Sequence, residues 1–180
     1  SPKASISRRD FGGPGGAPGR FHGPTGIAVT ENAIYVSDSG NRRVQKFDAA
    51  GKFLLAFHED EDGRALVHPA GLAADADGSI YVADRDDRRI LRFDSDGNYL
   101  ESIASAKLER PRGLHLSGDT LVVADEKNGA FFLNLSDRVW TDLPELRESN
   151  DVAAGFQRVF GATLDGQGGL LIADFAAGRV

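Results

Sequence analysis

The sequence has 180 residues, 41% of them hydrophobic, and a formal net charge of -6, which is the composition of a globular protein able to bury a core. It contains no cysteine, which excludes disulfides and thiolate zinc sites. No apolar run reaches the roughly 18 to 20 residues of a membrane span. Because binders of the phosphate backbone are usually basic, the acidic balance argues against a general nucleic-acid binder.

The first twenty residues are expected to finish a preceding unit. Residues 3–11 have the character of an outer strand, and the glycine-rich stretch 12–19 is typical of a flexible connection. That stretch lacks the Gly-Lys-Ser/Thr ending of a phosphate-binding loop. The chain also has no methionine, so we expect a processed chain or a piece of a longer protein.

From residue 21 onward the sequence repeats itself. The motif Gly26-Ile27-Ala28-Val29 returns in related form at Gly71, Gly113 and Gly161, with spacings of 45, 42 and 48 residues. Repetition at about 45 residues is typical of propeller blades.

Each complete repeat contains four short runs that predict strands. The first run is followed by an Ile-Tyr-Val-Ala-Asp type of run and then by an Arg-Val-x-x-Phe-Asp type, both rich in β-branched and aromatic residues. A weaker fourth run follows at residues 52–57 and 98–103, after turns such as Asp48 to Gly51. The pattern predicts an all-β fold, a β-propeller of four-stranded antiparallel blades.

These motifs resemble the NHL-repeat family, whose pattern is Pro-x-Gly-Ile-Ala-Val, then Ile-Tyr-Val-Ala-Asp-x-x-Asn-x-Arg-Val, then Phe-Asp-x-x-Gly. Repeat one follows the pattern from Pro24 through Asp38 to Gly51, whereas repeat two has Asp87 in place of the Asn and repeat three has Ala130 in place of the Arg. The resemblance covers residues 21–180 and is specific for the fold, although one fold hosts many functions.

The resemblance implies a propeller that usually closes with about six blades. We therefore expect a fragment, about three and a half blades present as an open arc, whose open strand edges favour self-association. The expected division of this single propeller domain is 1–20 for the outer strand and exit loop of a preceding blade, 21–66 for repeat one, 67–107 for repeat two, 108–155 for repeat three with a long loop, and 156–180 for a truncated repeat four.

Loops that follow the second and the fourth strand of each blade are expected on one face, because strands in a blade alternate in direction. Long loops on a rigid scaffold commonly carry recognition. We predict a partner-binding face there, with the candidate residues Asn41, Arg42, Glu59, Asp60, Asp86, Arg88, Lys127 and Asn128.

The longest of these loops spans residues 140–159. Its Asp142-Leu-Pro144-Glu145 stretch is typical of a helix N-terminus and predicts a short helix over residues 143–149. A lid packed on the edge of the blade is the favoured interpretation of that helix.

The aspartate that ends each second strand recurs in all four repeats, which favours a structural role over an acidic ring. Its carboxylate is expected to accept hydrogen bonds from loop amides or to pair with the arginine five positions later. The predicted structural positions are Asp38, Asp84, Asp125, Asp174, Arg43, Arg89 and Arg179.

No catalytic constellation is identified in the sequence. The acidic run of residues 59–62 would attract a divalent cation or a basic partner, but a solvated loop tip is the favoured interpretation. The histidines His22, His58, His68 and His115 do not have a strong metal-ligand spacing. We predict no catalytic residue, no cofactor and no metal site, with a divalent cation as the alternative.

The sequence therefore predicts an NHL-repeat propeller scaffold that binds a protein, peptide or carbohydrate partner through one loop face, within a larger multidomain protein. The alternative is a metal-dependent propeller enzyme of lyase or lactonase type whose site is completed by further blades. RNA binding, as in some NHL propellers, is disfavoured by the charge of -6. Arginine outnumbers lysine 16 to 5, which suggests a bacterial source, and both a cytoplasmic and an extracytoplasmic location fit.

Overall fold

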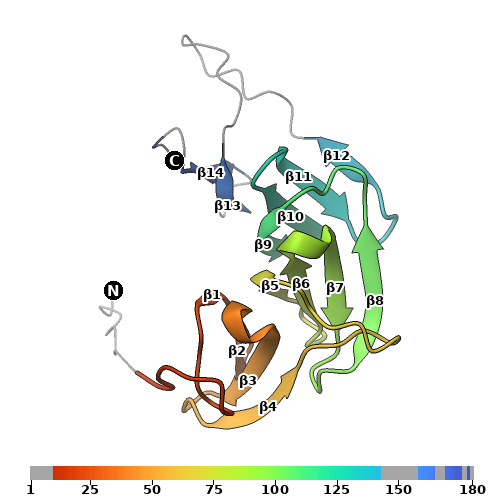
Figure 1. The fold of residues 1–180 in the computed structure, drawn as a ribbon. Coiled ribbons are helices and arrows are strands. Elements are labelled where there is room, and N and C mark those ends of the chain that lie inside the picture. Colours follow the sequence, from red (N-terminus) through yellow and green to blue (C-terminus); the bar gives the residue numbers. More distant parts are fainter. Residues whose placement is uncertain (1–9, 143–157, 165–168, 176–177, 179–180) are drawn as a thin grey trace, which may run out of the picture.

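The computed structural model describes residues 10–142, 158–164, 169–175 and 178. These residues form three four-stranded antiparallel sheets and one two-stranded sheet, arranged as an open arc (Figure 1). Each sheet is one blade, and the strands of a blade follow each other in chain order from the inside of the arc to its rim. The predicted fold class is confirmed.

The strand bounds follow the repeats. Blade one contains β1 (Pro24–Val29), β2 (Ala33–Asp38), β3 (Arg43–Asp48) and β4 (Phe53–Phe57), and blade two contains β5 (Pro69–Ala74), β6 (Ile80–Asp84), β7 (Arg89–Phe93) and β8 (Tyr99–Ala104). Blade three contains β9 (Pro111–Ser117), β10 (Thr120–Asp125), β11 (Gly129–Asn134) and β12 (Trp140–Asp142), and blade four contains β13 (Val159–Leu164) and β14 (Leu170–Asp174). Single turns of 3-10 helix, η1 (Ser39–Asn41) and η2 (Arg85–Asp87), follow β2 and β6.

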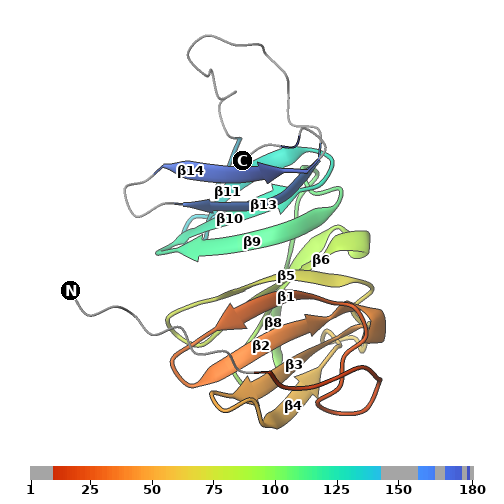
Figure 2. The same ribbon diagram turned by 90° about the vertical axis from the view of Figure 1, so that its left-hand side faces the viewer.

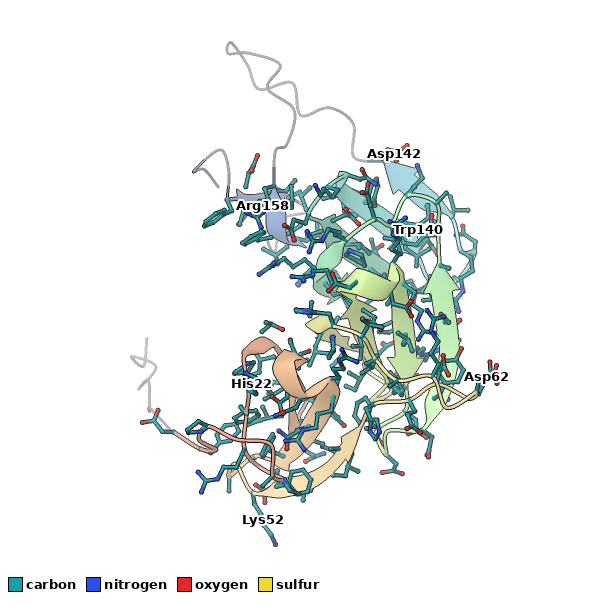
Figure 3. The ribbon with its side chains drawn as sticks, in the orientation of Figure 1. His22, Lys52, Asp62, Trp140, Asp142 and Arg158 are labelled. Carbon is teal, nitrogen blue, oxygen red and sulfur yellow. The ribbon has the colours of Figure 1, made fainter. Side chains whose placement is uncertain are left out.

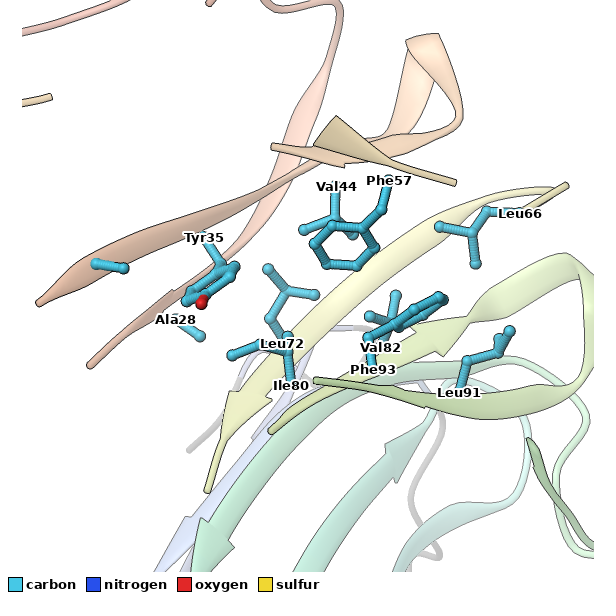
Figure 4. Packing of buried hydrophobic residues seen from close by; sticks show 11 residues of the cluster. Ala28, Tyr35, Val44, Phe57, Leu66, Leu72, Ile80, Val82, Leu91 and Phe93 are labelled. Atoms are coloured by element: carbon cyan, nitrogen blue, oxygen red, sulfur yellow. The ribbon is translucent and has the colours of Figure 1, made fainter. Parts of the chain in front are cut away.

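The hydrophobic core lies between the blades. Side chains of blade one, such as Tyr35 and Phe57, pack against Ile80, Val82 and Phe93 of blade two (Figure 4). Similar clusters join blade two to blade three and blade three to blade four. Strands such as β6 and β10 are buried along their whole length or nearly so, because both faces of a middle blade meet a neighbour.

The inner strands β1, β5, β9 and β13 contact one another in sequence along the arc (Figure 2). Glycines allow this close approach. A Cβ on Gly26 would lie 2.1 Å from the carbonyl oxygen of Ala70, and one on Gly71 would lie 2.4 Å from that of Arg112. The repeated glycine of the first motif therefore sets the distance between neighbouring blades.

The connection before blade one packs as the end of a blade would. Phe11 lies 4.9 Å from Phe47 between ring centroids, just as Phe57 of blade one lies 4.7 Å from Phe93 of blade two. The outer strand predicted for residues 3–11 falls mostly outside the described residues, as does the helix predicted for residues 143–149. The residue borders of the four repeats stay a prediction.

The blade end that carries η1, η2 and the loop of residues 58–68 is called the loop face below. The opposite end carries the short Asp-x-x-Gly turns, in which Asp48 Oδ1 and Asp94 Oδ1 accept hydrogen bonds from amides of their own turns. Within the described ranges no helix is long and apolar enough to cross a membrane.

Candidate functional site

The aspartate that ends the second strand of each blade is buried and holds the start of the first strand. Asp84 Oδ1 accepts a hydrogen bond from the amide of His68 at 2.7 Å. The corresponding amide donors to Asp38, Asp125 and Asp174 belong to His22, Arg110 and Arg158. Backbone amides of the same blade thus occupy these carboxylates, and the consequence for stability is a prediction argued below.

The arginine five positions later differs between blades. Arg43 Nε donates to Asp38 Oδ2 at 2.9 Å. Arg89 Nη1 donates instead to Asp60 Oδ2 at 2.7 Å, and Arg89 also pairs with Asp87. Arg179 lies outside the described residues.

The eight candidate residues for partner binding do not gather into one cluster. Asn41 donates hydrogen bonds to Asp38 and to the carbonyl of Gly15, and Asp60 is buried against Arg89. Six of the candidates are exposed, on four different loops, namely Arg42, Glu59, Asp86, Arg88, Lys127 and Asn128. Asp86 alone takes part in the network described next.

Four arginines and two carboxylates form a network where the loop face meets the inner strands. We call Arg85, Arg110, Arg112, Arg158, Asp86 and Glu126 the axial cluster. Glu126 is 3% exposed and accepts a hydrogen bond from Arg158 Nε at 2.8 Å, with Arg112 Nη1 at 3.4 Å and Arg110 Nη1 at 3.7 Å. Arg158 lies at the blade-four end of the arc and His22 at the blade-one end (Figure 3).

The second carboxylate connects the cluster to blade two. Asp86 accepts hydrogen bonds from Arg85 Nε and Nη2 at 2.9 and 3.1 Å, and Arg110 Nη2 lies 3.5 Å away. The imidazole Nδ1 of His68 is also 3.5 Å from Asp86. The network therefore runs across blades two, three and four.

Aromatic rings complete the cluster on blade four. The rings of Phe160 and Phe175 stack at 4.9 Å with an angle of 7° between their planes. The guanidinium of Arg112 lies 3.8 Å from the centroid of Phe160, and that of Arg158 lies 5.1 Å from it. Stacking of this kind orients a guanidinium while leaving its edge available to a ligand.

The electrostatics of the cluster are those of a site with excess positive charge. Burial opposes the ionisation of Glu126, but the hydrogen bond from Arg158 and the nearby arginine charges outweigh it and lower the pKa of that carboxyl. Burial, together with the charge of Arg85, lowers the pKa of His68. With His68 neutral, the four arginines exceed the two carboxylates by two charges.

A pocket of about 190 Å³ opens along the inner strands beside the axial cluster. Each blade contributes the residue that precedes the glycine of its first motif, and Arg85 and His68 lie at the same pocket. Ile27, Leu72 and Leu114 supply its apolar walls. The four residues before the glycines are Thr25, Ala70, Arg112 and Phe160.

The arginines, Glu126 and the aromatic rings of this site were not predicted as site residues. For Arg85, Arg112, Glu126 and the two phenylalanines the signal lies in two columns of the repeat alignment, the residue before the motif glycine and the residue after the strand-ending aspartate. Arg110 and Arg158 lie in neither column. Both columns vary although each lies next to a constant residue, the motif glycine or the strand-ending aspartate, and varying positions beside constant ones on a scaffold point to recognition. In the described part of the chain, no three side chains among His, Asp and Glu converge as metal ligands.

Comparison with known proteins bears on the family and the fold. The NHL repeat family matches residues 21–47 and 66–93. The chain carries NHL repeats. Protein brain tumor of Drosophila melanogaster is 40% identical over 65 residues, which are 32% of this chain and 6% of that protein.

Solved structures similar to this NHL arc include several propellers. A streptogramin B lyase superposes with a TM-score of 0.67 at 14% identity, over 84% of this chain and 48% of that chain. A nidogen/laminin complex superposes with a TM-score of 0.67 at 24% identity, over 87% of this chain and 57% of that chain. A virginiamycin B lyase from Staphylococcus aureus with quinupristin superposes with a TM-score of 0.63 at 17% identity, over 83% of this chain and 48% of that chain.

These likenesses concern the fold, and the chain spans about half the length of the lyases it matches. The NHL arc of this chain therefore corresponds to part of a propeller.

Proposed function

We propose that this NHL arc is part of a recognition module that binds a protein, peptide or carbohydrate partner through its loop face. The observation that carries the proposal is the axial cluster. Four arginines and two stacked phenylalanines are held there by ion pairs and ring contacts beside a pocket. Arginine and aromatic side chains held in place in this way are enriched where proteins recognise partners.

The contrast between the two faces supports the choice of the loop face as the recognition surface. On the opposite face the carboxylates of Asp48 and Asp94 are engaged by amides of their own turns. On the loop face the cluster draws residues from three blades into a shared network. One neighbour in fold, the nidogen/laminin structure, is a complex between proteins, which is compatible with such a role.

The alternative is a metal-dependent enzyme of lyase or lactonase type, and two neighbours in fold carry lyase names. No observation on the described side chains favours it, since the carboxylates and histidines near the pocket do not converge in threes. Titration of the intact protein with zinc and calcium, followed by calorimetry, tests this alternative directly.

The proposed function is tested by selecting ligands on the intact protein from a random peptide library and a glycan array. Ligands that bind the loop face should lose affinity with Arg158→Gln and keep it with Lys52→Gln. Both changes remove one positive charge, but Lys52 lies at the outer rim near the opposite face (Figure 3). Ligands that respond to neither change, or only to Lys52→Gln, would exclude the loop face as the recognition surface.

A further inference from the structure

A pair of residues at the loop face has matched chemistry in three of the four blades. The pair consists of the residue before the motif glycine and the residue after the strand-ending aspartate. Thr25 and Ser39 share a hydrogen bond, Arg112 and Glu126 form an ion pair, and Phe160 and Phe175 stack.

Blade two breaks the pattern. Its pair is Ala70 and Arg85, so the guanidinium has no partner across the pair and bonds to the adjacent Asp86 through Nε and Nη2. Both members of this unmatched pair line the pocket. The small side chain of Ala70 leaves room where the other blades place a larger group.

Arginine donors remain available at this pocket. Arg112 contacts Glu126 through Nη1 alone, so within the described residues its Nε and Nη2 donate to no acceptor. Arg85 likewise uses Nε and Nη2, and its Nη1 donates to no described residue. Both guanidinium groups are partly buried, where a charge-assisted hydrogen bond is stronger than at an open surface.

We propose that the pocket binds a carboxylate of an acidic peptide segment between Arg85 and Arg112, an inference that rests on the proposed function and specifies its ligand. A guanidinium edge matches a carboxylate in a bidentate geometry. The methylenes of a glutamate side chain would contact Ile27, Leu72 and Leu114, the apolar walls of the pocket.

The size of the pocket favours a side chain over a drug-sized ligand. Its volume of about 190 Å³ is smaller than the roughly 300 to 1,000 Å³ of pockets that enclose small molecules. A single inserted side chain with the rest of its peptide across the loop face fits this volume.

The charge favours a carboxylate over a nucleic-acid backbone. The axial cluster has only two positive charges in excess, and Asp86 and Glu126 are interleaved with its arginines. One or two carboxylates are therefore the better match.

The test uses a fluorescein-labelled hexaglutamate peptide, with a hexaglutamine peptide as the neutral control, and measures anisotropy on the intact protein. Hexaglutamate should bind at moderate salt and hexaglutamine should not. Arg112→Gln should weaken binding by about tenfold or more, because a charge-assisted contact is lost, whereas Lys52→Gln should leave the affinity unchanged.

A second variant guards against a structural effect of losing Arg112, which also contacts Glu126. Ala70→Val fills the pocket and keeps every arginine, and it should also weaken hexaglutamate binding. Absence of hexaglutamate binding, or binding insensitive to both variants, would overturn the proposal. So would a uridine hexanucleotide that binds more tightly than hexaglutamate and depends on Arg112.

The outcome separates this inference from the proposed function. If peptides selected from the random library bind the loop face but lack Asp and Glu, the carboxylate inference fails and the recognition role stands. If no selected ligand responds to loop-face variants, the recognition role itself fails.

Discussion

The guanidinium of Arg89 binds the carboxylate of Asp60, with 2.7 Å between Nη1 and Oδ2, and so joins β7, the third strand of blade two, to the loop that leaves blade one. Both side chains are less than a tenth exposed. Asp87 pairs with the same guanidinium and with Arg64 of that loop. The loop of residues 58–68 is therefore tied to blade two by buried charge as well as by backbone.

Replacing Arg89 by alanine should destabilise the protein by about 3 kcal/mol, because the nearly buried carboxylate of Asp60 loses its arginine partner and that of Asp87 loses one of two. Urea unfolding measures the loss. Arg138→Asn is the control, since Arg138 pairs with Glu101 at an exposed turn and asparagine tolerates its positive φ of 62°. The control should cost less than about 1 kcal/mol. Equal losses would show that the Arg89 pair adds nothing beyond a surface contact.

Asp84→Ala should destabilise blade two by about 1 to 3 kcal/mol, because the amides of Val67 and His68 lose their acceptor. Asp84→Asn should cost less. It keeps one acceptor oxygen, and burial raises the pKa of Asp84, so the neutral amide avoids the penalty for a buried charge. Thermal unfolding compares the two. A melt of Asp84→Ala unchanged within error would show that these aspartates do not hold the blades.

Stability should fall as the pH drops below the ordinary histidine pKa of 6.5, because the pKa of His68 in the folded protein is lower. Between the two values the unfolded chain binds more protons than the folded one, so acid favours unfolding. Above 6.5 the residue is neutral in both states and adds no pH dependence. His68→Gln should flatten this part of the curve when the free energy of unfolding is measured from pH 8 to pH 5. An identical slope in the variant would refute the assignment.

Substitutions at two turn glycines form a matched pair that tests how closely neighbouring blades pack. Gly78 and Gly97 have similar positive φ values, 87° and 83°. A Cβ on Gly97 would lie 2.7 Å from Phe57 Cδ1, while one on Gly78 would lie 3.6 Å from Ser95 Cβ. Gly78→Ala should cost about 1 to 2 kcal/mol for backbone strain alone, and Gly97→Ala clearly more. Chemical unfolding of both variants checks this, and equal costs would mean that Phe57 moves aside freely.

The blades could be predicted because the same strand pattern recurs in each repeat, so the turn residues, the strand-forming residues and the hydrophobic positions of every repeat indicate the same fold. Arg43 pairs with Asp38 as the repeat suggested, but Arg89 does not pair with Asp84. The loop of residues 58–68 differs in sequence from its counterparts in the other blades and brings Asp60 to Arg89. A contact made by one loop alone cannot be predicted from a pattern that the repeats share.

The axial cluster escaped prediction for a related reason. Arg112 and Glu126 belong to one repeat and Arg158 to the next, and Glu126 and Arg158 are 32 residues apart in the sequence. They meet only because the inner strands of neighbouring blades touch. These three residues do not belong to a motif that the repeats share, since the residue type at each of these positions is not the same in all blades.

The glycine of the first motif and the residue just before it have separate tasks. In blades one to three the glycine packs against the backbone of the next blade, so its identity is constrained by the spacing of the arc. The preceding residue, whether Thr25, Ala70, Arg112 or Phe160, faces the pocket and is free of that constraint. Selection can therefore revise the lining of the pocket one blade at a time without disturbing the architecture that carries it. Proteins with this arrangement can change the residues that line the pocket while the packing of their blades stays the same.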